Sequence, residues 1–186
     1  MNTTSLNHYD NSWFRKQIGA SRSKQFAWYF TNILFFMNPL NPSSALKIHI
    51  LKIFGSKLGQ GTIIKPGVNI KYPWKLIIGD HCWIGEKVWI DNLAVVEMGN
   101  NVCISQGAML LTGNHDYKSP KFDLIVKPIL LMDGAWVGAK GLVGPGVTIE
   151  SHAVLAAMSV ANKDLSAYTI YQGNPAIAVR QRIISN

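Results

Sequence analysis

The sequence predicts an all-β solenoid, a coil of parallel strands built from six-residue repeats. Aliphatic residues recur at every sixth position in three runs, over residues 58–70, 78–108 and 131–155. Glycine often follows the aliphatic residue directly, and a small or β-branched residue often stands four places after it. A period of six fits neither an α-helix nor a flat strand. It is typical of a triangular coil in which each repeat forms one short strand and one turn.

The aliphatic column is expected to fill the inside of this coil. Its members are Leu58, Ile64, Ile70, Ile78, Ile84, Ile90, Val96, Val102, Ala108, Leu131, Val137, Val143, Ile149 and Leu155. Three repeats close one turn, and successive turns stack by parallel strand pairing at about 4.8 Å. Because each fully buried aliphatic side chain contributes roughly 1.5–3 kcal/mol, this column can hold the fold together.

The chain divides into three parts along its length. Residues 1–57 are expected to form an N-terminal arm and helical cap, residues 58–165 the solenoid with a loop inserted at 112–130, and residues 166–186 a C-terminal tail. Residues 1–25 are polar and irregular, which predicts a poorly ordered or surface-lying arm. The unpaired strand edges at the two ends of a solenoid need covering, and the cap and the tail can supply it.

Two segments of the cap are expected to be helical. Residues 26–37 are apolar on nearly all sides, and two Asn-Pro pairs end this segment. Ser43 or Ser44 is expected to cap a second helix that runs to about Phe54. In that second helix the charge of Lys47 is expected to lie away from the apolar face. The apolar face is expected to hold Leu46, Ile50 and Ile53.

The charge balance restricts the class of partner. With 18 Lys and Arg against 10 Asp and Glu, the net charge of +8 suits an anionic partner, such as a phosphate-bearing cofactor or a membrane surface. No dense basic stripe with interleaved aromatic residues occurs, so we expect no nucleic-acid partner. Residues 26–54 combine a basic amphipathic pattern with an aromatic-rich segment. Two interpretations stay open for them: a lid over one end of the solenoid, or peripheral contact with a membrane.

Cysteine usage and the N-terminus indicate a cytoplasmic location. Cys82 and Cys103 form neither a disulfide framework nor a metal motif, so we expect small buried thiols in a reducing compartment. No basic start leads into an apolar stretch, and a cleaved signal is therefore not evident. The most apolar window, residues 26–37, is short of the about 20 residues that a membrane span needs. The inner face of the membrane is the alternative location.

A loop histidine is the candidate catalytic residue. The stretch Gly113–Tyr117 interrupts the repeats and lifts His115 away from the inward-pointing pattern. A histidine that titrates near neutral pH can take a proton from a hydroxyl and later return it to a leaving group. Asp116 could orient the imidazole, although neighbouring residues often point apart.

Polar and aromatic residues on the outside of the coil are candidates for contact with a substrate. Asp91 and Asn92 follow an inward aliphatic one coil before the loop and could bind acceptor hydroxyls; a polar turn is the alternative. Trp83, Trp89 and Trp136 each precede an inward aliphatic and are expected to face outward. Exposed tryptophans suggest a subunit interface or a platform for a sugar, and we favour the interface.

Several strings together resemble one enzyme family. They are Cys82–Ile90, Thr112–Tyr117, Asp133–Gly138, Gly144–Ile149, Gly173–Ala176 and Val179–Arg180. With the repeats, they resemble the left-handed β-helix acetyltransferases of the hexapeptide-repeat superfamily, in the subgroup of colanic-acid and exopolysaccharide O-acetyltransferases. The resemblance covers about residues 25–184. It implies a left-handed parallel β-helix and an acetyl transfer from acetyl-CoA to a saccharide hydroxyl.

The resemblance also implies the assembly and the site residues. It implies a homotrimer, with acetyl-CoA in the groove between neighbouring subunits and His115 as the catalytic base. The implied contacts to coenzyme A are Ala139 and Ala157 through their backbone, Asn162, Lys163 and Arg180. The chain departs from the family at Ile177, where related tails often carry a basic residue.

Other functions remain to be weighed. A free sugar, an amino sugar or serine could be the acceptor, and a non-enzymatic scaffold is a further alternative. Zinc carbonic anhydrases use the same solenoid and need three converging histidines. His81 and His152 lie three to four coils apart, roughly 15–18 Å along the axis, so with His115 they cannot share a metal within one chain. We therefore expect no metal.

Overall fold

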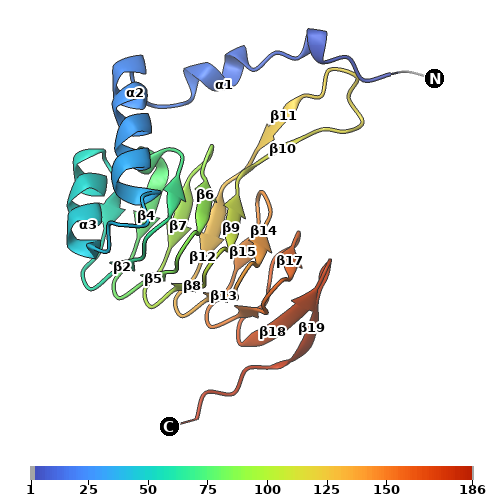
Figure 1. Ribbon diagram of the computed structural model, residues 1–186. Coiled ribbons are helices and arrows are strands. Elements are labelled where there is room, and N and C mark those ends of the chain that lie inside the picture. Colours follow the sequence, from blue (N-terminus) through green and yellow to red (C-terminus); the bar gives the residue numbers. More distant parts are fainter. Residues whose placement is uncertain (1–2, 186) are drawn as a thin grey trace.

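The computed structural model describes residues 3–185 and confirms the predicted β-solenoid (Figure 1). Short strands stack into three parallel sheets around one apolar interior. Helices cover the end where the first coil lies, and an antiparallel hairpin leaves the side of the coil. Among residues 3–185, none of the helices has the length and apolar character that crossing a bilayer requires.

The three faces of the coil are three sheets. The first sheet consists, in spatial order, of β1 (Lys57–Leu58), β4 (Leu76–Ile78), β7 (Val96–Met98), β12 (Ile129–Leu131) and β15 (Thr148–Ile149). The second consists of β2 (Ile63–Ile64), β5 (Trp83–Ile84), β8 (Cys103–Ile104), β13 (Trp136–Val137), β16 (Val154–Leu155), β18 (Thr169–Gly173) and β19 (Ala176–Gln181). The third consists of β3 (Asn69–Ile70), β6 (Trp89–Asp91), β9 (Met109–Leu111), β14 (Leu142–Val143) and β17 (Val160–Ala161).

The strand register corrects the middle of the predicted aliphatic column. Met98 pairs with Ile78, so the two-residue slip that follows the third strand recurs after β6. Val96, Val102 and Ala108, which we expected at the inward positions, are buried but stand two places before them. The inward residues are Met98, Ile104 and Leu110. Because residues two apart on a strand face the same side, both positions are buried and the pattern alone does not separate them.

The N-terminal helices cover the first coil. They are α2 (Arg22–Thr31), a π-helical turn η2 (Asn32–Phe36) that continues it, and α3 (Ser44–Ile53). Trp28, Phe36 and Leu51 are buried against the solenoid, and their side chains belong to its core. The indole nitrogen of Trp28 donates a hydrogen bond to the carbonyl of Ile70 at 2.8 Å. This bond fixes α2 to the end of β3.

The buried face of α3 differs from the predicted one. The buried residues are Lys47, Ile50 and Leu51, whereas Leu46 and Ile53 are exposed. The ammonium of Lys47 replaces the expected apolar contact by donating to two carbonyls, that of Asn41 in the segment before α3 at 2.8 Å and that of Ile64 on β2 at 3.3 Å. Burial, together with the nearby charge of Lys65, lowers the pKa of Lys47.

The N-terminal arm is ordered and lies on the surface. It contains η1 (Leu6–His8) and α1 (Ser12–Lys16), and it runs beside the projecting hairpin (Figure 1). The hairpin consists of β10 (Gly113–His115) and β11 (Leu124–Val126). The C-terminal strands β18 and β19 pair antiparallel, and β18 extends the second sheet beyond β16.

Candidate active site

The hairpin leaves the solenoid at a corner that is already enlarged in the earlier coils. The inward residues Ile90 and Met98 at this corner are eight positions apart, whereas Leu110 and Leu131 one coil later are 21 positions apart. Gly113 begins the hairpin, and a β-carbon there would lie 2.6 Å from a methyl group of Leu93. A larger residue at position 113 would therefore require the Leu93 side chain to shift.

His115 is held in one orientation by Phe122, which lies in the loop between the two strands of the hairpin. Its Nδ1 lies 2.8 Å from the carbonyl oxygen of Phe122, and its ring stacks on the Phe122 ring with centroids 4.2 Å apart. Because a carbonyl oxygen can only accept, Nδ1 carries a proton, and in the neutral imidazole Nε2 then has a free lone pair. Asp116 does not orient the ring as considered above. Its carboxylate accepts the backbone N–H of Lys118 at 2.9 Å.

The orienting role of Phe122 was missed at the level of sequence. Its backbone adopts a left-handed conformation with φ of +54°, which is uncommon for a residue with a side chain. The group that contacts His115 is a main-chain carbonyl, and every residue type carries one. Only the ring stacking depends on the residue being aromatic.

The imidazole faces a cavity of about 640 Å³ between the arm, the hairpin and the solenoid. The charged and hydroxyl-bearing side chains of the lining are Tyr9, Arg15, Lys71, Tyr72 and Asp91. The ring centroid of Tyr9, on the arm, lies 5.4 Å from that of His115. The arm therefore forms one wall of the cavity that contains the candidate base.

Asp91 lies in this cavity, and Asn92 does not. The Asp91 carboxylate is half-buried, with one oxygen 3.2 Å from the Lys71 ammonium. That oxygen accepts no hydrogen bond among the described residues, so Lys71 acts on it as a charge and not as an aligned donor. Burial and the charge of Asp91 raise the pKa of Tyr72.

The expected surface position of Asn92 is wrong. Its side chain is fully buried, because the amide oxygen accepts from the N–H of Tyr72 at 2.9 Å and the amide nitrogen donates to the Tyr72 carbonyl at 2.6 Å. Asn92 thus joins two successive coils at the enlarged corner. Both functional ends of its amide are occupied, so it is not available to an acceptor hydroxyl.

The residues expected to contact coenzyme A lie away from His115. Ala139 and Ala157 lie at the same corner of successive coils, where the carbonyl of Ala139 accepts the N–H of Met158 at 2.8 Å. Asn162 and Lys163 are exposed just after β17. None of these residues, nor Arg180, lines the cavity at His115. A single copy of the chain does not bring the two sets together.

The described part of the tail, residues 166–185, contains two arginines that differ in their contacts. Arg182 donates to the carbonyls of Gly134 at 3.0 Å and His152 at 3.1 Å, which ties the end of the tail to the solenoid. Arg180 is exposed on β19, and Ile177 is exposed on the same strand. Within residues 3–185, no group of three or more His, Cys, Asp or Glu side chains lies close enough to hold a metal ion.

Comparison with known proteins gives consistent relatives, although no family model matches the chain. Over 134 residues it is 39% identical to a protein of Escherichia coli K12 named as the colanic acid biosynthesis acetyltransferase WcaF. This match covers 72% of this chain and 74% of the relative. Over 153 residues it is 25% identical to the galactoside O-acetyltransferase of the same strain, covering 80% and 75%. A hexapeptide-repeat acetyltransferase from Vibrio cholerae, solved with acetyl-coenzyme A, has the same fold with a TM-score of 0.77. That match covers 98% of this chain and 97% of the other, at 23% identity.

Proposed function

Because the chain belongs to the colanic acid acetyltransferases of the hexapeptide-repeat type, we propose that it acetylates a sugar hydroxyl in exopolysaccharide biosynthesis, with His115 as general base. The acyl donor is acetyl-CoA. The observation that carries the proposal is the position of His115. Its Nδ1 proton is held by a carbonyl, and its ring lines a cavity that also contains a half-buried carboxylate.

The geometry of the imidazole supports a two-way proton transfer. Nε2 takes the proton of the acceptor hydroxyl while that oxygen attacks the thioester carbonyl of acetyl-CoA. The tetrahedral intermediate then breaks its carbon–sulfur bond, and the imidazolium returns the proton to the thiolate of coenzyme A. Throughout the cycle, the Phe122 carbonyl accepts a hydrogen bond from the Nδ1–H group and stabilises the imidazolium. Backbone N–H groups are the expected donors to the oxyanion.

Coenzyme A is proposed to lie along the corner that contains Ala139 and Ala157, with Asn162, Lys163 and Arg180 near its polar groups. In one copy these residues lie away from His115, which supports a site completed between copies of the chain, as in a homotrimer. Three exposed cationic or amide side chains suit the phosphates of the donor. Asp91 is the proposed contact to the acceptor saccharide.

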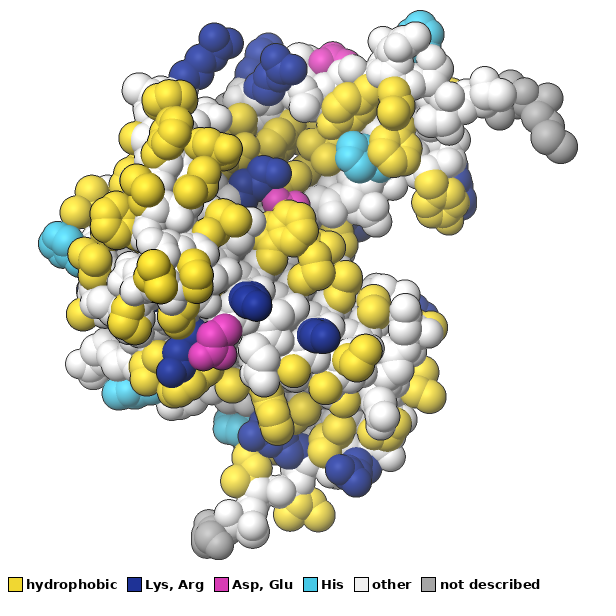
Figure 2. Space-filling view, in the orientation of Figure 1, with side chains coloured by type: hydrophobic (Ala, Val, Ile, Leu, Met, Phe, Trp, Pro, Cys, Tyr) yellow, Lys and Arg dark blue, Asp and Glu magenta, His cyan; other side chains and the backbone are white. Residues whose placement is uncertain are grey.

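The helical cap is proposed to contact the inner face of the cytoplasmic membrane. Figure 2 shows hydrophobic side chains gathered over the helical end of the molecule. The exposed members in the helices and the segment between them include Phe26, Phe30, Leu34, Leu40, Leu46 and Ile53. An apolar surface of this kind on a protein with a net charge of +8 is suited to an anionic bilayer.

Vesicle binding tests the membrane contact. The wild type is expected to co-sediment with vesicles that contain anionic phospholipid, and the double variant Phe30→Glu/Leu34→Glu is expected to lose most of this binding. Ile183→Glu changes an exposed apolar residue at the far end of the chain and is expected to bind as the wild type does. Equal binding by all three proteins would argue against this surface.

An acceptor screen tests the proposed function. Purified protein is incubated with acetyl-CoA carrying a ¹³C-labelled acetyl group and a panel of neutral saccharides, amino sugars and serine, and the products are read by mass spectrometry. We expect a labelled acetyl group on at least one neutral saccharide. Label only on an amino group or on serine would identify a different acceptor class. No label on any compound, with coenzyme A bound, would favour a scaffold.

A further inference from the structure

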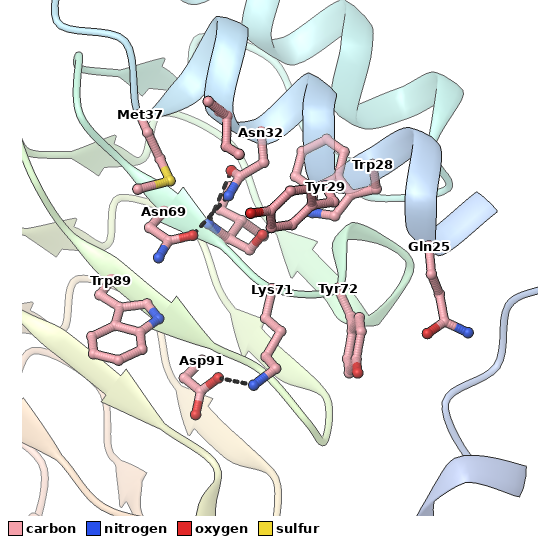
Figure 3. A pocket seen from close by; sticks show the side chains of 12 residues that line it. Gln25, Trp28, Tyr29, Asn32, Met37, Asn69, Lys71, Tyr72, Trp89 and Asp91 are labelled. Atoms are coloured by element: carbon pink, nitrogen blue, oxygen red, sulfur yellow. Dashed lines mark hydrogen bonds and ion pairs between the residues drawn. The ribbon is translucent and has the colours of Figure 1, made fainter. Parts of the chain in front are cut away.

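A second chamber adjoins the cavity of His115. It lies between the third sheet and the helical segment formed by α2 and η2, and its volume is about 450 Å³ (Figure 3). Its wall contains the aromatic residues Trp28, Tyr29, Tyr72 and Trp89. Binding sites for small molecules have volumes of roughly 300–1,000 Å³ and are built largely from apolar and aromatic side chains with a few polar groups.

The two chambers form one cleft. Both are lined by Gln25, Lys71, Tyr72 and Asp91. The ion pair between Lys71 and Asp91, drawn in Figure 3, therefore stands at the boundary of the two chambers. Trp89 lines the second chamber, and His115 lines the first. A ligand that reaches His115 with one end can extend past this ion pair into the second chamber.

Two polar side chains of the second chamber, Asn69 and Asp91, can take part in binding a ligand. Asn69 uses its side-chain oxygen to accept from Asn32 at 2.7 Å, and its amide nitrogen is turned toward the space between Trp89 and Asp91 (Figure 3). Asp91 also lines the chamber, and its carboxylate is paired by charge with Lys71. An amide donor and a carboxylate thus line the chamber beside an indole ring that is 40% exposed.

We infer that this second chamber binds a sugar ring adjacent to the ring that is acetylated, so the acceptor is an oligosaccharide or a glycoside with at least two rings. The inference rests on the proposed function. The flat faces of Trp89 and Tyr29 can pack against the C–H face of a pyranose. Its hydroxyls can accept from the amide nitrogen of Asn69 and donate to the carboxylate of Asp91, whereas a wholly apolar occupant would leave the Asn69 nitrogen unpaired at a cost in free energy.

Acceptor length is the first test. Initial rates with acetyl-CoA are measured for glucose and galactose, for cellobiose, maltose and lactose, and for octyl glucoside. At least one disaccharide is expected to give a kcat/KM about tenfold or more above that of its monosaccharide. Equal kcat/KM values for monosaccharides and disaccharides would overturn the inference while leaving the proposed function in place. A gain with octyl glucoside that matches the best disaccharide would identify an apolar slot and would also overturn it.

Two matched variants locate the effect. Trp89→Ala is expected to lower the kcat/KM for the preferred disaccharide about tenfold, mainly through KM, and to leave the monosaccharide within about twofold. Trp83→Ala removes a tryptophan of nearly equal exposure, 41%, from the second sheet outside both chambers, and it should retain the preference for the disaccharide. Light scattering reports the oligomeric state of both variants. Dissociation of Trp89→Ala alone would identify Trp89 as an interface residue and would contradict the sugar subsite.

Discussion

His115→Ala is expected to lower kcat for acetyl transfer by about 10²–10⁴-fold, the range that a positioned general base contributes. The ring lines the cavity and is held through Nδ1, so the substitution removes the atom that accepts the hydroxyl proton. The KM for acetyl-CoA should change little, because the proposed contacts that hold the donor are made by Ala139 and Ala157 and not by the imidazole. Steady-state kinetics with the acceptor found in the screen measures the effect.

A second histidine supplies the control for this substitution. His49→Ala removes an exposed imidazole from α3, and it is expected to keep kcat within about twofold of the wild type. Both variants should retain the oligomeric state and thermal midpoint of the wild type. If His115→Ala kept wild-type kcat while binding acetyl-CoA normally, the base would have to be another group.

Phe14→Ala is expected to lower kcat/KM about 10- to 100-fold although Phe14 does not contact the imidazole. Phe14 and Ile18 are buried with Leu93 in a small apolar cluster, separate from the solenoid core, that joins the arm to the solenoid and the hairpin. Removing the ring should loosen the hairpin that carries His115. A displacement of about 1 Å at a catalytic group can cost about 10²-fold in rate. Kinetics and hydrogen exchange of the hairpin amides measure the two effects.

The position of the cluster predicts a local effect. The thermal midpoint of the solenoid should move little, because the cluster holds only the arm and the hairpin while the main core is intact. Trp13→Ala is the control, since Trp13 is the neighbouring aromatic residue but is largely exposed. Unchanged exchange at residues 113–126 in Phe14→Ala would show that the arm does not position the loop.

The solenoid was predictable because the residues that repeat with a period of six are aliphatic, and these residue types have one structural role, which is to fill the interior of the coil. An aliphatic residue at every sixth position has no other common use, and the structure has the expected three sheets. The errors in the inward column arose where two neighbouring apolar positions are both buried. Val102 and Ile104 are both buried, so the hydrophobic pattern permits either as the inward residue, and only strand pairing decides. The burial of Lys47 was not predicted because it depends on two carbonyls that come together only in the folded chain.

For the candidate site, the sequence pointed to the loop histidine but not to the main-chain contacts around it. His115 stood out because it interrupts the repeats, and the structure places it in a cavity. The Phe122 carbonyl that holds it has no signature in the sequence. Asn92 was misplaced because a polar residue after a strand can serve a ligand or bridge two coils, and the deciding partner, Tyr72, is 20 residues away. The position of the N-terminal arm beside His115 was likewise not predicted, since the arm contains few apolar residues that would indicate packing against the solenoid.

The chemical identity of the product tests the central claim most directly. Acetyl-CoA labelled with ¹³C in its acetyl group is incubated with the preferred saccharide and either the wild type or His115→Ala, and the product is followed by NMR. We predict that the wild type forms an O-acetyl ester that mild alkali cleaves, and that the variant forms it at least about 10²-fold more slowly. An alkali-stable amide, or an ester formed at the same rate by both proteins, would contradict this account.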